Sequence, residues 1–354
     1  MELHENKPNP VEFSATKVVQ AYGLRKCPKL VEQLSGEDLR LRVNVLAVLC
    51  EEFHNPYVIQ GCAQAGVVRV LSSLVSDPDY VTRERSSKAL SLMAEDANGI
   101  SAILTEEETV VVEILNGIKD PSEVVRSNIY DCIYHITRTR RGIDACVIAG
   151  VATSFAEVAK REVDSLKPKV LQSLHNIASS SDGMIQALNA SSVETCIGLL
   201  NDNSLGTETK SFAAKALGLL CFDEEAKFSA LENHAVPTLV KLCGIDSGMT
   251  IPVKINATLA LMAITSTDEG KRQLNDPNTI KILSTLIYED NRSIRLHVVK
   301  LLSNAAVFPP IRPLLLEDAP FMNFLKRISI PGGSGDPLLE KHALLALNAV
   351  NWVP

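Results

Sequence analysis

Histidine and cysteine are the side chains in this sequence best suited to bind a metal ion or act as a nucleophile, but their spacing favours neither chemistry. No two of the seven histidines stand three or four residues apart, the spacing that places two imidazoles on one face of a helix. The cysteines form no C-x-x-C pair, and most lie in apolar runs, where a free thiol behaves as a small apolar side chain. We therefore expect buried, reduced cysteines and no bound metal, with a zinc site or a disulfide framework as the alternative. The eight cysteines are Cys27, Cys50, Cys62, Cys132, Cys146, Cys196, Cys221 and Cys243.

Two segments could bind an anion. The run Gly-Gly-Ser-Gly at residues 332–335 resembles a phosphate-binding loop only in its glycines, because no lysine follows and Pro337 comes next. We expect a plain flexible loop there. The cluster Arg-Thr-Arg-Arg at residues 138–141 indicates either a solvated helix end or a contact with an acidic partner. No serine or cysteine lies in a nucleophile-elbow pattern, and no carboxylate pair stands out, so we expect neither an enzyme nor a cofactor.

The segment 256–264, Asn-Ala-Thr-Leu-Ala-Leu-Met-Ala-Ile, is apolar or small on nearly every side, so a helix with this sequence must be enclosed. Related segments recur along the chain with a spacing of 41 to 45 residues between their central apolar residues. This period is typical of HEAT and armadillo arrays, in which each unit packs on its neighbours. The central residues are Leu46, Leu90, Ile133, Leu174, Leu217, Leu261, Leu302 and Leu347.

Turn residues keep step with this period. Asp77 and Asp120 each precede proline thirteen residues before a central residue, and we expect them to be N-caps of the buried helices. Gly66 and Gly150 follow the buried helices and are suited to a left-handed turn. The pattern predicts units of a short helix, a long buried helix, a turn and a long third helix, which favours armadillo over the two-helix HEAT form.

The predicted fold class is therefore all-α, an armadillo-repeat right-handed solenoid of about eight units. We expect residues 1–22 to form an N-terminal tail and capping helix and residues 23–354 to form the solenoid. A hydrophobic content of 46% suffices for a long continuous core, and a net charge of −7 disfavours general attraction to nucleic acid or anionic membranes. The polar first ten residues and the lack of an apolar run near the roughly 18 residues that span a bilayer predict a soluble intracellular protein.

Solenoids bind partners through a concave face, which we expect the third helices to line. Aligning those helices predicts one exposed column of partner-binding residues, with Arg327 as an alternative for its last member. Its mixed charges disfavour a groove for one long acidic tail, as in the beta-catenin type. The column consists of Glu32, Ser73, Asn116, Lys241, Thr285 and Lys326.

Nuclear-import adaptors carry a tryptophan and, four residues later, an asparagine on successive buried helices. That ladder is missing here, and the only tryptophan of the chain is Trp352. The sequence therefore disfavours binding of nuclear-import cargo. The corresponding pairs are Lys88 with Leu92, Gln172 with Asn176, Lys215 with Leu219, and Leu259 with Ala263.

The N-terminal part of the chain resembles one armadillo family in particular, the radial spoke head protein 14 family. The residues that carry this resemblance are Pro8-Asn9-Pro10-Val11, Leu30, Arg42, Leu46, Leu49-Cys50-Glu51 and His54-Asn55-Pro56. The resemblance implies a non-catalytic structural subunit of the axonemal radial spoke, the T-shaped complex that links outer doublet microtubules to the central apparatus of motile cilia and flagella. It implies a location in the cytoplasm, in the cytoskeleton of the cilium or flagellum axoneme.

The partners implied by the resemblance are other radial spoke subunits, including a long helical stalk protein, with no nucleic acid, membrane or small-molecule substrate. Two other functions stay open. A cytosolic or junctional armadillo adaptor would bind exchangeable peptide partners through the same groove, and a regulatory subunit of an enzyme complex would dock through its loops.

Overall fold

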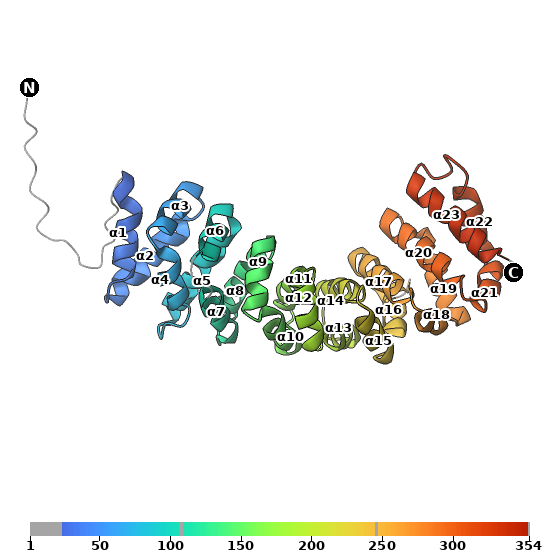
Figure 1. Ribbon diagram of the computed structural model, residues 1–354, viewed down its shortest axis with the longest axis horizontal. Helices are drawn as coiled ribbons and strands as arrows, with labels where there is room; N and C mark the ends of the chain where they lie inside the picture. Colours follow the sequence, from blue (N-terminus) through green and yellow to red (C-terminus); the bar gives the residue numbers. More distant parts are fainter. Residues whose placement is uncertain (1–22, 106–108, 245–246, 353–354) are drawn as a thin grey trace, which may run out of the picture. The chain divides into compact units, whose positions relative to one another are not determined.

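The computed structural model describes residues 23–105, 109–244 and 247–352, and the regular secondary structure in these ranges is entirely helical (Figure 1). The chain divides into two compact units, unit 1 at residues 1–149 and unit 2 at residues 150–354. The expected tail and capping helix at residues 1–22 lie outside the described residues, so the expected boundary at residue 22 stays a prediction.

Eight long helices contain the recurring apolar segments, as the period predicts. Seven of the eight central residues have no exposed surface, and the eighth, Leu347, is half-buried on the last long helix. Eight long helices are compatible with about eight units. In unit 1 they are α2 (Leu39–Glu52), α5 (Tyr80–Glu95) and α8 (Glu123–Ile136), and in unit 2 they are α11 (Lys167–Ile177), α14 (Thr207–Leu220), α17 (Ile251–Ile264), α20 (Arg292–Ala305) and α23 (Pro337–Val350).

A shorter helix follows each of the first seven long helices. The prediction that a short helix precedes the buried helix is wrong, because polar residues just after the buried helices cap a new helix instead. Thr139, for example, accepts the backbone N–H of Gly142 at 3.0 Å. A Cβ at Gly142 would lie 2.0 Å from the carbonyl oxygen of Ile136, so this sharp turn requires glycine. These helices are α3 (Pro56–Gln64), α6 (Ala97–Thr105), α9 (Arg140–Ile148), α12 (Ser181–Asn189), α15 (Glu224–Glu232), α18 (Asp268–Gln273) and α21 (Ile311–Glu317).

Third helices complete the units, and they are shorter than predicted: most have eight to ten residues. The chain enters α4 and α10 through left-handed residues, Gly66 and Gly150, as expected, and Ser191 and His234 adopt the same conformation without being glycine. The third helices are α1 (Lys26–Leu34), α4 (Val67–Leu74), α7 (Thr109–Asn116), α10 (Val151–Arg161), α13 (Ser192–Asn201), α16 (Ala235–Cys243), α19 (Pro277–Thr285) and α22 (Ala319–Ile328). Short 3-10 helices flank three of them: η1 (Gly23–Arg25), η2 (Gly117–Lys119) and η4 (Leu286–Tyr288).

Asp77 and Asp120 are not the N-caps of the long helices, contrary to the prediction. The N-caps are Asp79 for α5 and Ser122 for α8, two residues later in each turn. The carboxylate of Asp77 instead accepts the N–H of Asp79 at 2.8 Å and pairs with Arg42 on the preceding long helix at 3.0 Å. Each turn is thus tied to the neighbouring repeat by a charged contact.

Side-chain amides fix the register of neighbouring long helices within each unit. In unit 1, Asn128 of α8 donates to the carbonyl of Glu84 at 3.3 Å and to the hydroxyl of Ser87 at 3.1 Å on α5. In unit 2, Asn256 of α17 donates to the carbonyl and the hydroxyl of Ser211 on α14, both at 3.0 Å. Because these groups are largely enclosed by the helix pairs, a slip of one residue would leave them without partners.

Candidate functional site

The predicted partner-binding residues lie on six different third helices. Five of them stand two residues after a side chain with no exposed surface, which gives them equivalent positions in their repeats. Glu32, Ser73, Asn116 and Lys241 are exposed and Thr285 is half-buried; the buried residues that precede them are Leu30, Leu71, Ile114, Leu239 and Leu283. We call this set the third-helix column.

The same rule identifies the member of the column on each remaining third helix. On α22 the buried residue is Leu325, so Arg327 is equivalent to Lys241, and Lys326 is exposed one residue earlier. On α10 and α13, which the sequence alignment left out, the rule gives Glu157 and Gly198, both exposed. The apolar spacing of these two helices was the signal that could have located them. The column is split between unit 1 and unit 2, and its role in partner binding stays a proposal.

Long helices, rather than third helices, form the inner edge of the arc within unit 2. Figure 1 shows α14, α17, α20 and α23 in a row along this edge, with α15 and α18 on the opposite side. The expectation that third helices line the concave face therefore does not hold for this unit. We call the exposed side of these four helices the long-helix face; its side chains that are at least partly exposed include Phe212, Lys215, Leu219, Leu259, Met262, His297, Lys300, Lys341, His342 and Leu345.

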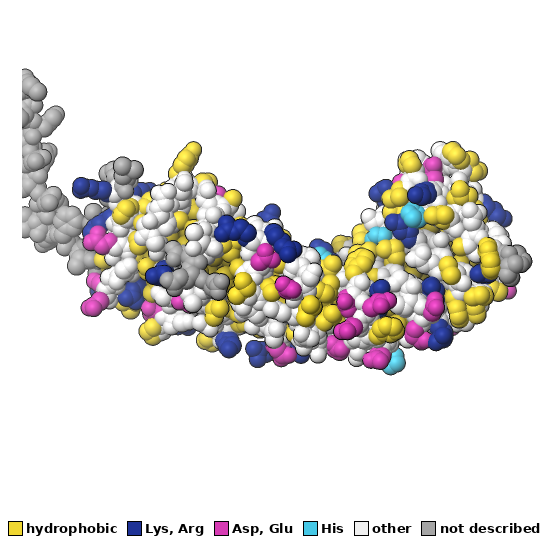
Figure 2. Space-filling view, viewed as in Figure 1, with side chains coloured by type: hydrophobic (Ala, Val, Ile, Leu, Met, Phe, Trp, Pro, Cys, Tyr) yellow, Lys and Arg dark blue, Asp and Glu magenta, His cyan; other side chains and the backbone are white. Residues whose placement is uncertain are grey.

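The charges on the long-helix face are mainly cationic, although the whole chain carries a net charge of −7. Lys215, Lys300 and Lys341 supply these charges, while burial lowers the pKa of His297 and of His342, which favours their neutral form. Figure 2 shows basic side chains and histidines gathered over α20 and α23, and acidic side chains near α15 and α18. Acidic and basic side chains are mixed on the side of α15 and α18, where Asp268 pairs with Lys271 and Glu269 with Arg272.

The glycine-rich loop at residues 332–335 is hydrogen-bonded to a carboxylate of its own chain; its expected flexibility stays a prediction. Glu340 of α23 accepts the backbone N–H groups of Gly332, Ser334 and Gly335 at 3.1, 3.0 and 3.1 Å. These hydrogen bonds hold the pKa of Glu340 below its usual value. Because a carboxylate already occupies the amides, they do not form an open phosphate cradle.

Cysteine side chains in the described residues are mostly buried. Six of the eight are buried and Cys27 and Cys50 are half-buried, and all eight are unpaired thiols. Burial raises the pKa of Cys146 and of Cys196 to about 12, which disfavours the reactive thiolate form. The basic cluster at residues 138–141 runs from the turn after α8 into the first turn of α9; Arg140 pairs with Asp144 at 3.3 Å, and Arg138 is exposed. No helix in the described ranges is long and apolar enough to cross a membrane on its own.

Comparison with known proteins identifies one relative that bears directly on function. The chain is 27% identical over 252 residues to radial spoke protein 14 of Chlamydomonas reinhardtii, and the match covers 68% of this chain. The chain spans about 64% of the length of that relative. No family model matches the chain. The resemblance to the radial spoke head protein 14 family, predicted from the N-terminal residues, is confirmed.

Solved structures show the same fold. An engineered protein superposes with a TM-score of 0.82 over 93% of this chain and 79% of its own, at 22% sequence identity. A designed armadillo repeat protein has a TM-score of 0.59 and 20% identity, covering 67% of this chain and 99% of its own. A second design, solved in complex with a (KR)4 peptide, has a TM-score of 0.59 and 21% identity, covering 68% of this chain and 99% of its own. The chain is therefore an all-helical armadillo-repeat solenoid.

Proposed function

We propose that this protein is a non-catalytic structural subunit of the axonemal radial spoke, which binds a helical or extended segment of another spoke subunit and supports ciliary or flagellar motility. The observation that carries this proposal is the sequence similarity to radial spoke protein 14 over 252 residues. An armadillo-repeat solenoid suits the role, because stacked repeats present long surfaces to extended partners.

Two surfaces could hold the partner segment. The third-helix column combines acidic, neutral and basic side chains, a mixture that favours choice of partner and register over raw affinity. The long-helix face of unit 2 combines three lysines with apolar side chains such as Leu259 and Met262. We propose the column, Glu32, Ser73, Asn116, Lys241, Thr285 and Lys326, as the surface that contacts a long helical stalk protein. The long-helix face is the competing surface.

A second candidate function is that of a cytosolic adaptor for exchangeable peptides. It is supported by the peptide bound to one of the designed armadillo proteins of the same fold. A scaffold would stay with the axoneme when detergent removes the membrane and soluble proteins, whereas an adaptor would leave with the soluble fraction.

Proximity labelling in a motile ciliated cell tests the proposal. A biotin ligase fused to this chain is expected to label radial spoke subunits in the detergent-resistant axoneme more strongly than a matched ligase fused to a soluble ciliary protein. If the fusion is detergent-soluble and labels no spoke subunit above that control, the radial spoke proposal is wrong and the adaptor function takes its place.

A further inference from the structure

Three junctions between neighbouring repeats carry the same ion pair. A cation four residues after the N-cap of one long helix meets a carboxylate two residues before the N-cap of the next long helix. The pairs are Arg42 with Asp77 at 3.0 Å, Arg83 with Asp120 at 2.6 Å, and Lys254 with Glu289 at 2.5 Å. We call this arrangement the junction ladder.

At the last junction the ladder has its cation but not its carboxylate. The N-caps of α20 and α23 are Asn291 and Asp336, so the ladder positions are Arg295 and Ser334. Arg295 donates to the backbone carbonyl of Ile287 at 3.2 Å. Its ion pair within the described residues is with Asp290, at 3.3 Å, whose side chain is fully solvated. A carboxylate equivalent to Asp77 or Asp120 is therefore missing beside Arg295.

An earlier junction also lacks the carboxylate, but there the cation is enclosed. Lys210 occupies the ladder position of α14 and Gly248 the position before α17, yet Lys210 is only 4% exposed. Arg295 instead lines a cavity of about 510 Å³ that opens to solvent. The last junction thus combines an incomplete ion pair with room for a ligand.

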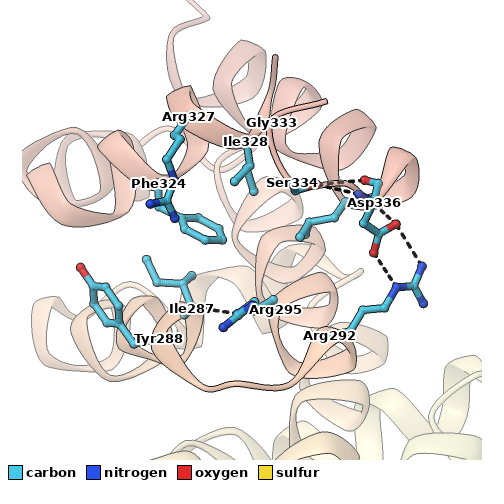
Figure 3. Close-up of a pocket in the computed structure, with 11 residues that line it drawn as sticks. Ile287, Tyr288, Arg292, Arg295, Phe324, Arg327, Ile328, Gly333, Ser334 and Asp336 are labelled. Carbon is cyan, nitrogen blue, oxygen red and sulfur yellow. Dashed lines mark hydrogen bonds and ion pairs between the residues drawn. The ribbon is translucent and has the colours of Figure 1, made fainter. Parts of the chain in front are cut away.

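Figure 3 shows how side chains from several elements surround this cavity. Arg295 and Arg292 come from α20, Phe324 and Arg327 from α22, Ile287 and Tyr288 from η4, and Ser334 from the glycine-rich loop. The ring of Tyr288 is largely exposed, and the Arg327 guanidinium lies 5.8 Å from the centre of the Phe324 ring. The lining therefore contains aromatic and aliphatic surface next to cations.

The charges of the lining do not cancel. Arg292 is neutralised by Asp336, which accepts two of its N–H groups at 2.5 and 3.0 Å. Two further cations belong to the lining: Arg295, whose ion pair is with the solvated Asp290 outside the lining, and Arg327. Asp336 is the acidic side chain of the lining, and the Glu340 carboxylate is bonded to the lining residue Ser334. Guanidinium groups recognise carboxylates through paired N–H donors, and the aromatic contact of Arg327 holds its side chain without neutralising it.

We propose that this cavity, the last-junction pocket, binds a carboxylate side chain of an acidic protein segment. The bound carboxylate takes the place beside Arg295 that Asp77 and Asp120 occupy beside Arg42 and Arg83, and Arg327 contacts a second acidic residue of the segment. Tyr288, Phe324 and Ile328 cover the apolar part of its side chains. This inference rests on the proposed function as a protein scaffold and specifies the chemistry of one partner segment.

A fluorescein-labelled peptide of eight glutamates tests the pocket with the full-length protein, by fluorescence anisotropy. We expect measurable binding that weakens as salt is added, because the contacts are between partly exposed charges. Arg295→Gln and Arg327→Gln should each weaken binding at least fivefold.

Two matched variants serve as controls. Lys119→Gln and Arg138→Gln each remove one positive charge from an exposed site of unit 1; both should bind the peptide within twofold of the unaltered protein. Unchanged thermal unfolding would show that each variant is folded. Binding of the peptide by Arg295→Gln and by Arg327→Gln within twofold of the unaltered protein would overturn the pocket, and so would loss of binding only in the unit 1 variants. Either result would leave labelling of spoke subunits in the axoneme, and hence the proposed function, unaffected.

Discussion

Individual polar residues inside the solenoid are held in one protonation state by burial. His175 of α11 is an example, because its Nδ1 atom is buried without a hydrogen-bond partner within the described part of the chain. Burial, helped by the positive charge of Lys215, lowers the pKa of His175 from 6.5 to about 4. The neutral ring is therefore the form that the folded chain favours at this half-buried position at pH 7.

We expect the stability of unit 2 to depend on pH through this residue. The pKa of His175 is lower in the folded than in the unfolded chain, so its contribution is complete above pH 6.5 and is lost as the pH falls toward 4. At 1.36 kcal/mol per pH unit, the loss between pH 7 and pH 5 is about 2 kcal/mol. Urea unfolding at both pH values should show this loss, and His175→Gln should reduce the pH dependence by that amount. An identical pH dependence in the variant would contradict the assignment.

At the residue scale the sequence predicted burial better than polar contacts. The 41 to 45 residue period located seven fully buried central residues, because a side chain enclosed between repeats must be apolar in every copy. It did not predict that Asp77 and Asp120 pair with arginines of the preceding repeat. An aspartate in a turn is equally suited to an N-cap and to an ion pair, and the choice depends on an arginine more than thirty residues away in the sequence.

Helices are joined to their neighbours by the junction ladder, and this contact should contribute measurably to stability. The side chain of Asp120 is 5% exposed and that of Arg83 is 16% exposed, so little solvent screens the pair. Asp120→Asn would replace the carboxylate beside Arg83 with a neutral amide, so Arg83 would lose the negative charge of the pair and keep neutral acceptors such as the backbone carbonyls of residues 77 and 78. We expect a loss of about 2 kcal/mol in the free energy of unfolding of unit 1, within the range for a hydrogen bond to a charged group.

Hydrogen exchange measures the effect of losing this ion pair locally. The backbone amides of α5 and α8 should exchange faster in the Asp120→Asn variant than in the unaltered protein. Lys29→Gln is the matched control, because its pair with Glu32 is exposed on α1 and such pairs are worth only about 0–1 kcal/mol. Equal exchange in both variants would mean that the ladder is no stronger than a surface ion pair.

The sequence predicted the presence of three helices in each repeat better than it predicted their order. The sequence indicated three helices per repeat but placed the short helix before the buried one, because the capping residues after the long helices were not recognised. Thr139 followed by Gly142 and Thr267 followed by Gly270 mark these starts, and both glycines stand where a Cβ would meet a carbonyl oxygen of the preceding turn. The last-junction pocket was not predicted at all, since it depends on a carboxylate that is absent at one junction and present at others.

At the scale of the whole molecule, function depends on which exposed surface holds the partner. The third-helix column and the long-helix face differ in charge, so charge reversal can distinguish them in isolated axonemes. Lys241→Glu with Lys326→Glu alters exposed positions on α16 and α22, and Lys300→Glu with Lys341→Glu alters the long-helix face. All four side chains are at least partly exposed, so neither pair should unfold the protein.

If the third-helix column is the attachment surface, the Lys241 and Lys326 variant should be released from axonemes at a lower salt concentration than the unaltered protein. The long-helix variant should resist extraction like the unaltered protein, as should a control with Lys119→Glu and Arg138→Glu on exposed sites of unit 1. Immunoblots of the salt-extracted and pelleted fractions measure the difference. Release of only the long-helix variant would move the attachment to that face.

The released variant should also change ciliary motility. Mixed polar contacts set the choice of partner more than affinity. We therefore expect cilia to assemble, because doublets do not need this spoke subunit in order to form, but to beat weakly. Normal beating after complete removal of the protein would contradict the radial spoke role itself.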